Sequence, residues 1–191
     1  MRKIVSNFFI SLDGVVEAPH EWHFPYFDDA MGQIIGDGMA SQTTFLMGRN
    51  LYDEWSRYWT TEGADDPFGG HINKIDKLVL THRPIEGELW NNTSVLGGPD
   101  GGAPAAALRE LKQQGGGDIG MSGCATTVRW LLANDLLDEL HLLVHPIAVG
   151  KGQRLFEETG TVPLTLLSSN ALPTGVLHLV YAPAQRAGGG I

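Results

Sequence analysis

Short apolar runs alternate along the chain with segments whose apolar residues recur at helical spacing. The apolar runs, rich in β-branched and aromatic residues, predict strands at 3–12, 43–47, 77–81, 93–96, 118–123 and 138–150. The segments between them predict helices at 25–40, 49–55, 67–75, 105–114 and 125–137. The chain therefore reads as a regular succession of strands and helices.

This alternation predicts an α/β fold with a mostly parallel central sheet and helices on both faces. The first strand is apolar on both faces near its middle, as expected of a central strand covered by helices. The last two predicted strands, 164–168 and 176–181, flank a Pro-Thr-Gly turn and predict an antiparallel pair at the C-terminal end. We find no repeat and no linker. We therefore expect one domain over 1–183 and a loose glycine-rich tail over 184–191.

Composition excludes several classes of protein. A single cysteine, Cys124, excludes a disulfide framework and a zinc site built on cysteines, which favours a cytoplasmic protein. A net charge of −9 argues against partners such as nucleic acid or an anionic membrane surface. No apolar run has the length of a membrane span. A small-molecule partner fits these properties best.

Three turns that follow predicted strands carry groups able to hold an anion. Ligands of wound α/β sheets bind at the carboxyl ends of the strands, where the first N–H groups of the next helix also lack partners. The turns at these places are Gly48–Arg49, Thr81–Arg83 and Ser122–Thr126. Together they predict an anion site at one edge of the sheet.

Each turn also has a plainer interpretation. Ser122 to Thr126 lacks both the Walker sequence and the full GxGxxG pattern, and is also consistent with an ordinary turn capped by Ser122. Arg49 is also consistent with a surface arginine paired to Asp53 or Glu54. Thr81 to Arg83 is also consistent with a solvated turn before a proline.

The segment FLMGRNLYDEW, 45–55, resembles the MGR-x-T-[WY]-E segment of dihydrofolate reductases. SLDG, WHFPYFDD and LTHRP fall in the same order as in that family. The stretch from DIGMSG to GQRLF is similar to the reductase domain of riboflavin biosynthesis and its stand-alone relatives. The resemblance extends to about Tyr181 and implies a dihydrofolate reductase-like fold. Leu51 replaces the threonine of the motif, and the 60–70 loop has no counterpart that we can identify.

The resemblance implies NADPH as the cofactor. Gly48, Arg49 and Asn50 would contact its phosphates, and Thr81, His82 and Arg83 would contact the adenosine end with its 2′-phosphate. The turn after the 118–123 strand would lie against the pyrophosphate and the nicotinamide ribose. Its residues are Ser122, Gly123, Cys124, Ala125 and Thr126.

The substrate side is implied by the same resemblance. Dihydrofolate reductases fix the substrate with one carboxylate near the first helix, and Asp28 or Asp29 lies close to that place. Each is also consistent with a solvated acid at a helix start. The further substrate-binding candidates are Asp13, Trp22 and the loop residues Gly150, Lys151 and Gly152. That loop is also consistent with a purely solvated one.

We therefore expect an NADPH-dependent reductase of a small nitrogen heterocycle, with a riboflavin-pathway aminopyrimidine ahead of dihydrofolate. The alternative is a non-catalytic nucleotide- or flavin-binding module with the same fold. A metal-dependent hydrolase built on His20 and His23 is disfavoured because no third ligand is evident, and we expect no metal. A homodimer is expected through the terminal strands and the 141–145 strand.

Overall fold

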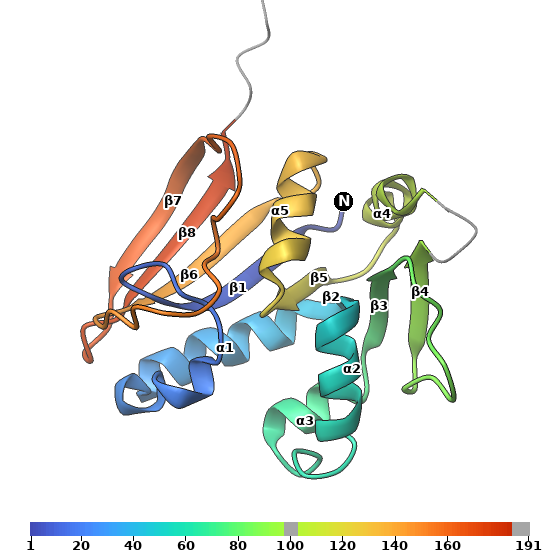
Figure 1. Ribbon diagram of the computed structural model, residues 1–191, viewed down its shortest axis with the longest axis horizontal. Helices are drawn as coiled ribbons and strands as arrows, with labels where there is room; N and C mark the ends of the chain where they lie inside the picture. Colours follow the sequence, from blue (N-terminus) through green and yellow to red (C-terminus); the bar gives the residue numbers. More distant parts are fainter. Residues whose placement is uncertain (98–102, 185–191) are drawn as a thin grey trace, which may run out of the picture.

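The computed structural model describes residues 1–97 and 103–184, which form one sheet of eight strands with helices on both faces (Figure 1). The strand order across the sheet is β4-β3-β2-β5-β1-β6-β8-β7. The strands are β1 Ile4–Ser11, β2 Gln42–Gly48, β3 Asp76–Thr81, β4 Thr93–Gly97, β5 Asp118–Ser122, β6 Glu139–His145, β7 Leu164–Ala171 and β8 Leu177–Pro183. The helices are α1 Asp29–Ser41, α2 Arg49–Tyr58, α3 Pro67–Ile72, α4 Pro104–Gln113 and α5 Ala125–Ala133, with short 3₁₀ turns η1 Pro19–Glu21 and η2 Phe24–Tyr26.

The sheet is parallel from β4 through β6, and only β8 and β7 run antiparallel to their neighbours. This confirms the predicted fold class, including the antiparallel pair at the C-terminal end. Sequence periodicity was enough to predict the sheet, because the buried parallel strands are short apolar runs and every crossover between parallel strands except the one from β3 to β4 contains a helix.

The two faces of the sheet are covered by different helices. Leu46, Ile119 and Met121 pack in the large core cluster that also holds residues of α4 and α5. Phe45 and Met47, on the opposite face, pack with α2 and α3, and Phe9 packs with α1. Figure 1 shows the same division, with α4 and α5 above the sheet and α1, α2 and α3 below it.

The strands β1 and β5 separate at their carboxyl ends. Their pairing stops at Asn7 and Ser122, whereas β1 remains paired with β6 as far as Ser11 and His145. Beyond Ser122 the chain enters α5 on one face, and beyond Ser11 it leads to α1 on the other. Connections that leave neighbouring strands toward opposite faces create the crevice in which wound sheets bind ligands.

Several element boundaries differ from those predicted. The helix expected over 25–40 begins only at Asp29, because Asp28 adopts an extended conformation and caps it, while Pro25 lies in η2. α5 ends at Ala133, since the next residues form a turn in which Asp135 has a positive φ of 54°. Within the described residues, no helix combines the length and apolar character that crossing a bilayer requires. Most of the glycine-rich connection and of the C-terminal tail, 98–102 and 185–191, lies outside the described residues.

Candidate functional site

Two helix N-termini meet at the carboxyl edge of the sheet. α2 follows Gly48 and α5 follows Cys124, and neither N-cap residue supplies a side-chain hydrogen bond to its helix. The Gly48 N–H donates to Cys124 Sγ at 3.3 Å, and a Cβ on Gly48 would lie 2.8 Å from Thr127 Oγ1. Only glycine therefore allows the two turns to approach so closely. The result is a pair of adjacent helix starts with uncapped amides, an arrangement that attracts anions.

The turn before α5 brings its backbone against α2. Gly123 has a positive φ of 69°, a conformation that favours glycine, and a Cβ there would lie 3.7 Å from Leu51 Cδ1. Leu51 is the residue that replaces the motif threonine, so the hydroxyl is exchanged here for an apolar contact. Two of the three predicted turns are thus neighbours in space.

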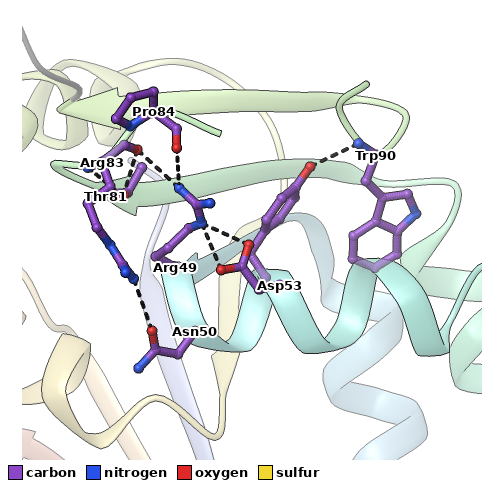
Figure 2. Close-up of polar contacts among 8 residues, drawn as sticks. Arg49, Asn50, Asp53, Thr81, Arg83, Pro84 and Trp90 are labelled. Carbon is purple, nitrogen blue, oxygen red and sulfur yellow. Dashed lines mark hydrogen bonds and ion pairs between the residues drawn. The ribbon is translucent and has the colours of Figure 1, made fainter. Parts of the chain in front are cut away.

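Arg49 joins α2 to the third turn. Its Nε donates to both carboxylate oxygens of Asp53 at 2.8 and 2.9 Å, and its Nη1 donates to the carbonyls of Arg83 and Pro84 at 3.2 and 2.6 Å (Figure 2). The ion pair with Asp53, left open by the sequence, is therefore present. Asp53 balances the charge of Arg49, so much of this guanidinium serves to hold the 81–84 turn against α2.

Arg83 is the less engaged cation of the pair. Its Nη2 donates to Asn50 Oδ1 at 3.3 Å, and its backbone N–H is held by Thr81 Oγ1 at 3.0 Å (Figure 2). Within 1–97 and 103–184 no carboxylate forms an ion pair with it. The charge of Arg83 is therefore available to an external anion beside the start of α2, and exposed His82 precedes it in the same turn.

A cleft of about 520 Å³ runs beside this turn and α2. Its lining includes Arg49, Arg57 and Arg83, together with the acidic side chains of Asp53, Glu86 and Glu88. The mixed charges leave the cleft close to neutral, and the positive character beside the start of α2 comes from Arg83, because Asp53 balances Arg49. We name the three turns around the starts of α2 and α5 the anion corner: Gly48 to Asn50, Thr81 to Arg83 and Ser122 to Thr126.

Cys124 is a packed thiol inside the anion corner. Burial raises its pKa to about 11, even though the Gly48 N–H and the Thr127 hydroxyl, which both lie within hydrogen-bonding distance of the sulfur, favour the thiolate. The side chain is therefore neutral at physiological pH. Its position indicates a role in spacing the two helix starts.

Asp13, on the substrate side, is held by internal hydrogen bonds. Its carboxylate accepts from the Ser11 hydroxyl at 2.6 Å and from the N–H groups of Val149 and Gly150 at 3.0 and 2.8 Å. These bonds, led by the one from Ser11, lower the pKa of Asp13 to about 2. The Arg154 side chain also donates to the Asp13 carbonyl at 3.1 Å. We name Asp13 and its partners in 149–154 the clasp.

The glycines of the clasp are required by its backbone. Gly150 and Gly152 have φ values of 82° and 112°, and a Cβ on Gly152 would lie 3.0 Å from Val15 Cγ1. Lys151 between them is exposed. The structure thus places Asp13, Gly150, Lys151 and Gly152 together at the carboxyl edge of β1 and β6.

The two acids proposed for catalysis, Asp28 and Asp29, differ in the hydrogen bonds that their carboxylates accept. Asp28 caps α1, since its carboxylate accepts from Met31 N–H at 2.8 Å and from the Thr174 hydroxyl at 3.2 Å. Asp29 is exposed in the first turn of the same helix and forms no side-chain hydrogen bond within the described residues. Of the two, only Asp29 has a carboxylate without an internal partner.

Neutral aromatic side chains cover the ends of β1 and β6. Trp22 is buried, its Nε1 donates to the Glu17 carbonyl at 3.2 Å, and its ring lies 5.2 Å from that of His145. His23 stacks on Phe9 at 4.4 Å, and burial lowers its pKa to about 4. In the part of the chain that the structure describes, no three His, Cys, Asp or Glu side chains gather as a metal site. His23 is therefore a neutral part of this wall.

Asn7 is a polar residue of the crevice that sequence reasoning missed. It pairs in register with Ser122 at the point where β1 and β5 separate, it is half-buried, and no described residue bonds its side chain. It escaped notice because it stands inside the apolar run of the first strand. The signal that could have found it is an amide side chain in the middle of an apolar run, because a polar group at such a position needs a hydrogen-bond partner.

Comparisons with known proteins identify a family and several relatives that are similar to this chain. A sequence profile of the RibD C-terminal domain matches residues 2–178. The uncharacterized protein YyaP of Bacillus subtilis is 25% identical over 188 residues, which cover 94% of each chain. A putative riboflavin biosynthesis protein from Shewanella sp. PV-4 has a TM-score of 0.73 at 18% identity, covering 95% of this chain and 98% of that one.

A more distant structure shares the fold as well. A dihydrofolate reductase from Enterococcus faecalis, solved in complex with NADP(H), has a TM-score of 0.59 at 13% identity, covering 95% of this chain and 96% of the other. These structural likenesses establish the fold, and the profile match over almost the whole sequence establishes descent. The chain belongs to the RibD C-terminal domain family.

Proposed function

We propose that the protein is an NADPH-dependent reductase of a small nitrogen heterocycle related to the aminopyrimidines of riboflavin biosynthesis. The observation that carries the proposal is the anion corner. Two helix starts without side-chain caps meet there, beside the Arg83 guanidinium, with which no carboxylate of the described residues forms an ion pair. Membership of the RibD C-terminal domain family supports the same reaction class.

The residues of the anion corner suit a dinucleotide that carries phosphates at two places. The amides at the starts of α2 and α5 would hold the pyrophosphate, because both helix dipoles favour negative charge there. Arg83 and Asn50, with the remaining donors of Arg49, would hold the 2′-phosphate that distinguishes NADPH from NADH. The nicotinamide would then reach the crevice between β1 and β5.

The crevice offers few charges to a substrate. Asn7 and Ser122 supply an amide and a hydroxyl, and the clasp and the aromatic wall close its β6 side. Such a lining suits a flat heterocycle whose ring nitrogens and carbonyls hydrogen-bond with neutral groups. When bound, NADPH would supply a hydride, and the protein would orient the ring and exclude water.

Titration calorimetry with NADPH and NADH tests the cofactor assignment. We expect NADPH to bind at least about tenfold more tightly, the difference made by one charged hydrogen-bonded contact. The loss of reduced-nicotinamide absorbance is then followed with dihydrofolate and with an aminopyrimidine as substrates. Absence of binding to either dinucleotide would overturn the proposal.

A binding module without turnover is the second candidate. It is favoured by Asp28, because this one of the two acids near the family's catalytic position is engaged in capping α1 and in bonding Thr174. NADPH binding without oxidation by any substrate of the panel would select this alternative. An Asn7→Ala variant sharpens the choice, since a raised KM with unchanged NADPH affinity places a substrate in the crevice.

A further inference from the structure

A second cavity lies at the amino edge of the sheet, opposite to the anion corner. Its volume is about 700 Å³, and it is found where β2, β3 and β4 begin and α4 ends. Among the described residues, its lining shares none with the anion corner, the clasp or the aromatic wall. We name it the amino-edge cavity, and its lining includes Arg2, Thr44, Asp76, Leu78, Ser94 and Leu111.

Arg2 is a buried cation in the wall of this cavity. It retains 7% of its accessible surface, and its Nε donates to the Gly117 carbonyl at 2.7 Å. Its Nη2 donates to the hydroxyls of Thr43 and Thr44 at 3.1 and 2.6 Å, whereas its Nη1 has no hydrogen-bond partner among the described residues. No described carboxylate forms an ion pair with it. A buried guanidinium held only by neutral acceptors is costly, because its charge has lost water and gained no anion.

Asp76 supplies a negative charge in the same cavity. It is exposed, and within 1–97 and 103–184 its carboxylate forms no ion pair. Burial lowers the pKa of Arg2 below its ordinary value, while Asp76 and Asp118 act in the opposite direction. Asp76 is therefore close enough to influence Arg2 but not to contact it. The amino-edge cavity thus holds two opposite charges that stand apart.

The remainder of the lining is aliphatic or neutral. Leu78 and Leu111 supply apolar surface, and Gln114, the C-cap residue of α4, lies beside them. The C-terminal end of a helix carries partial negative charge, so it favours a cationic group, as Asp76 does. The cavity therefore offers one place for an anionic group, one for a cationic group and an apolar surface for an aliphatic one.

We propose that the amino-edge cavity binds a small aliphatic zwitterion with the chemistry of a free α-amino acid. The carboxylate of the ligand would bond to Arg2 and to the neighbouring threonine hydroxyls, and its ammonium group would lie beside Asp76 and the end of α4. Its aliphatic part would cover Leu78 and Leu111. A simple anion would be repelled by Asp76 and a simple cation by Arg2, so a ligand with both signs fits best. This site does not depend on the proposed reductase activity.

Three matched probes, titrated into the full chain, test the chemistry of the ligand. Leucine carries both charges, leucinamide lacks the carboxylate, and 4-methylpentanoate lacks the ammonium group. Backbone amide signals followed by NMR give the affinity and locate the perturbed residues. We expect leucine to bind at least about tenfold more tightly than either other probe, because each of those omits one charged contact. Similar affinities for the three probes, or no saturable change with leucine, would overturn the proposal.

Variants at the two charges test the location of the site. Asp76→Asn should weaken leucine binding at least about tenfold and should leave 4-methylpentanoate binding unchanged or tighter, since a repulsive charge is removed. Asp118→Asn is the matched control, because Asp118 also raises the pKa of Arg2 but lies outside the lining. Arg83→Ala, in the anion corner, should leave leucine affinity unchanged. Loss of leucine binding in Arg83→Ala, or unchanged binding in Asp76→Asn, would overturn the proposal.

A steric pair of variants gives a readout that does not require a change at buried Arg2. Ser94 pairs in register with Leu78, so Ser94→Phe should fill the amino-edge cavity and abolish leucine binding. Val95 is the next residue of β4 and points to the opposite face, so Val95→Phe should bind leucine as the wild type does. Equal leucine affinity in the two variants would place the ligand elsewhere and overturn the proposal.

Discussion

The anion corner and the clasp lie at the same edge of one sheet but use their polar groups in opposite ways. In the anion corner two helix starts lack side-chain caps, and within 1–97 and 103–184 the Arg83 guanidinium has the amide of Asn50 as a partner and no balancing carboxylate. In the clasp the Asp13 carboxylate already receives three hydrogen bonds from its own chain. The anion corner therefore has donors available to a ligand, whereas the Asp13 carboxylate of the clasp is already satisfied by its own chain.

This difference separates a region suited to binding a ligand, the anion corner, from a region that defines the shape of the crevice, the clasp. Open donors beside helix N-termini gain most from an added anion, whereas a satisfied carboxylate gains little from a new partner. The clasp and the neighbouring aromatic wall therefore define the crevice. The anion corner supplies the charge that a cofactor would meet.

The largest expected effect of a single change on binding comes from Arg83→Ala. Removing a cation that no carboxylate in the described part of the chain balances should weaken NADPH binding about 10- to 100-fold, as expected for a hydrogen bond to a charged group. NADH binding should change little, so the preference for NADPH should narrow. Arg109→Ala removes a guanidinium that donates to the Asn134 carbonyl, outside the anion corner, and is the control for net charge. Equal losses of NADPH affinity in both variants would mean that Arg83 acts only through the net charge of the protein and does not contact the cofactor.

A smaller effect on affinity is expected for Arg49→Ala, because Asp53 already balances this arginine. NADPH binding should weaken about 3- to 10-fold, while loss of the bonds to the 83–84 carbonyls should lower stability by about 1–2 kcal/mol. Asp53→Asn should act in the opposite direction and tighten NADPH binding, since it releases the Arg49 charge. Calorimetric titration and thermal unfolding measure both quantities. Weaker binding in Asp53→Asn would contradict the assigned balance of charge.

Asp13→Asn should loosen the clasp without changing NADPH affinity. An amide keeps one acceptor but loses the charge that holds Val149 and Gly150, so the melting temperature at pH 7 should fall by a few degrees. The lowered pKa of Asp13 means that this stabilisation is complete above its unfolded pKa of 3.8 and disappears as pH falls to about 2. The two proteins should therefore converge in stability at acid pH, as thermal scans across pH would reveal. Asp37→Asn, at an exposed site of α1, is the control.

The fold was predictable because its signals are local. Each buried strand is a short apolar run, and the register and strand order confirm the parallel sheet and its antiparallel end. The boundaries of an element differed from those predicted where a single side chain determines them. Asp28 moved the start of α1 because its carboxylate caps the helix, which residue spacing does not reveal.

The candidate site was predictable in position but not in the state of its groups. Strand ends and turn residues located the three turns, and the structure brings Gly48, Cys124 and Leu51 into contact. The engagement of Arg49 by Asp53 depends on side-chain geometry across one helical turn, so the sequence left it open. Asn7 was missed because its neighbours in the sequence are those of an ordinary buried strand.

The smallest expected effect concerns the aromatic wall, where His23 is packed as a neutral ring. It tests the contrast between this neutral wall and the charged anion corner. Its pKa is lowered from 6.5 to about 4 by burial, so the unfolded chain binds more protons than the folded chain between these values. Wild-type stability should therefore fall as pH decreases below 6.5, with a contribution from His23 of about 1 kcal/mol by pH 5.5. His23→Phe keeps the ring between Phe9 and Phe24 and should lose less stability over this range, as measured by urea unfolding at each pH. His20→Gln, at an exposed position, should follow the wild type. Identical pH profiles for wild type and His23→Phe would mean that His23 accepts a proton within the fold, and the wall would then carry charge as the anion corner does.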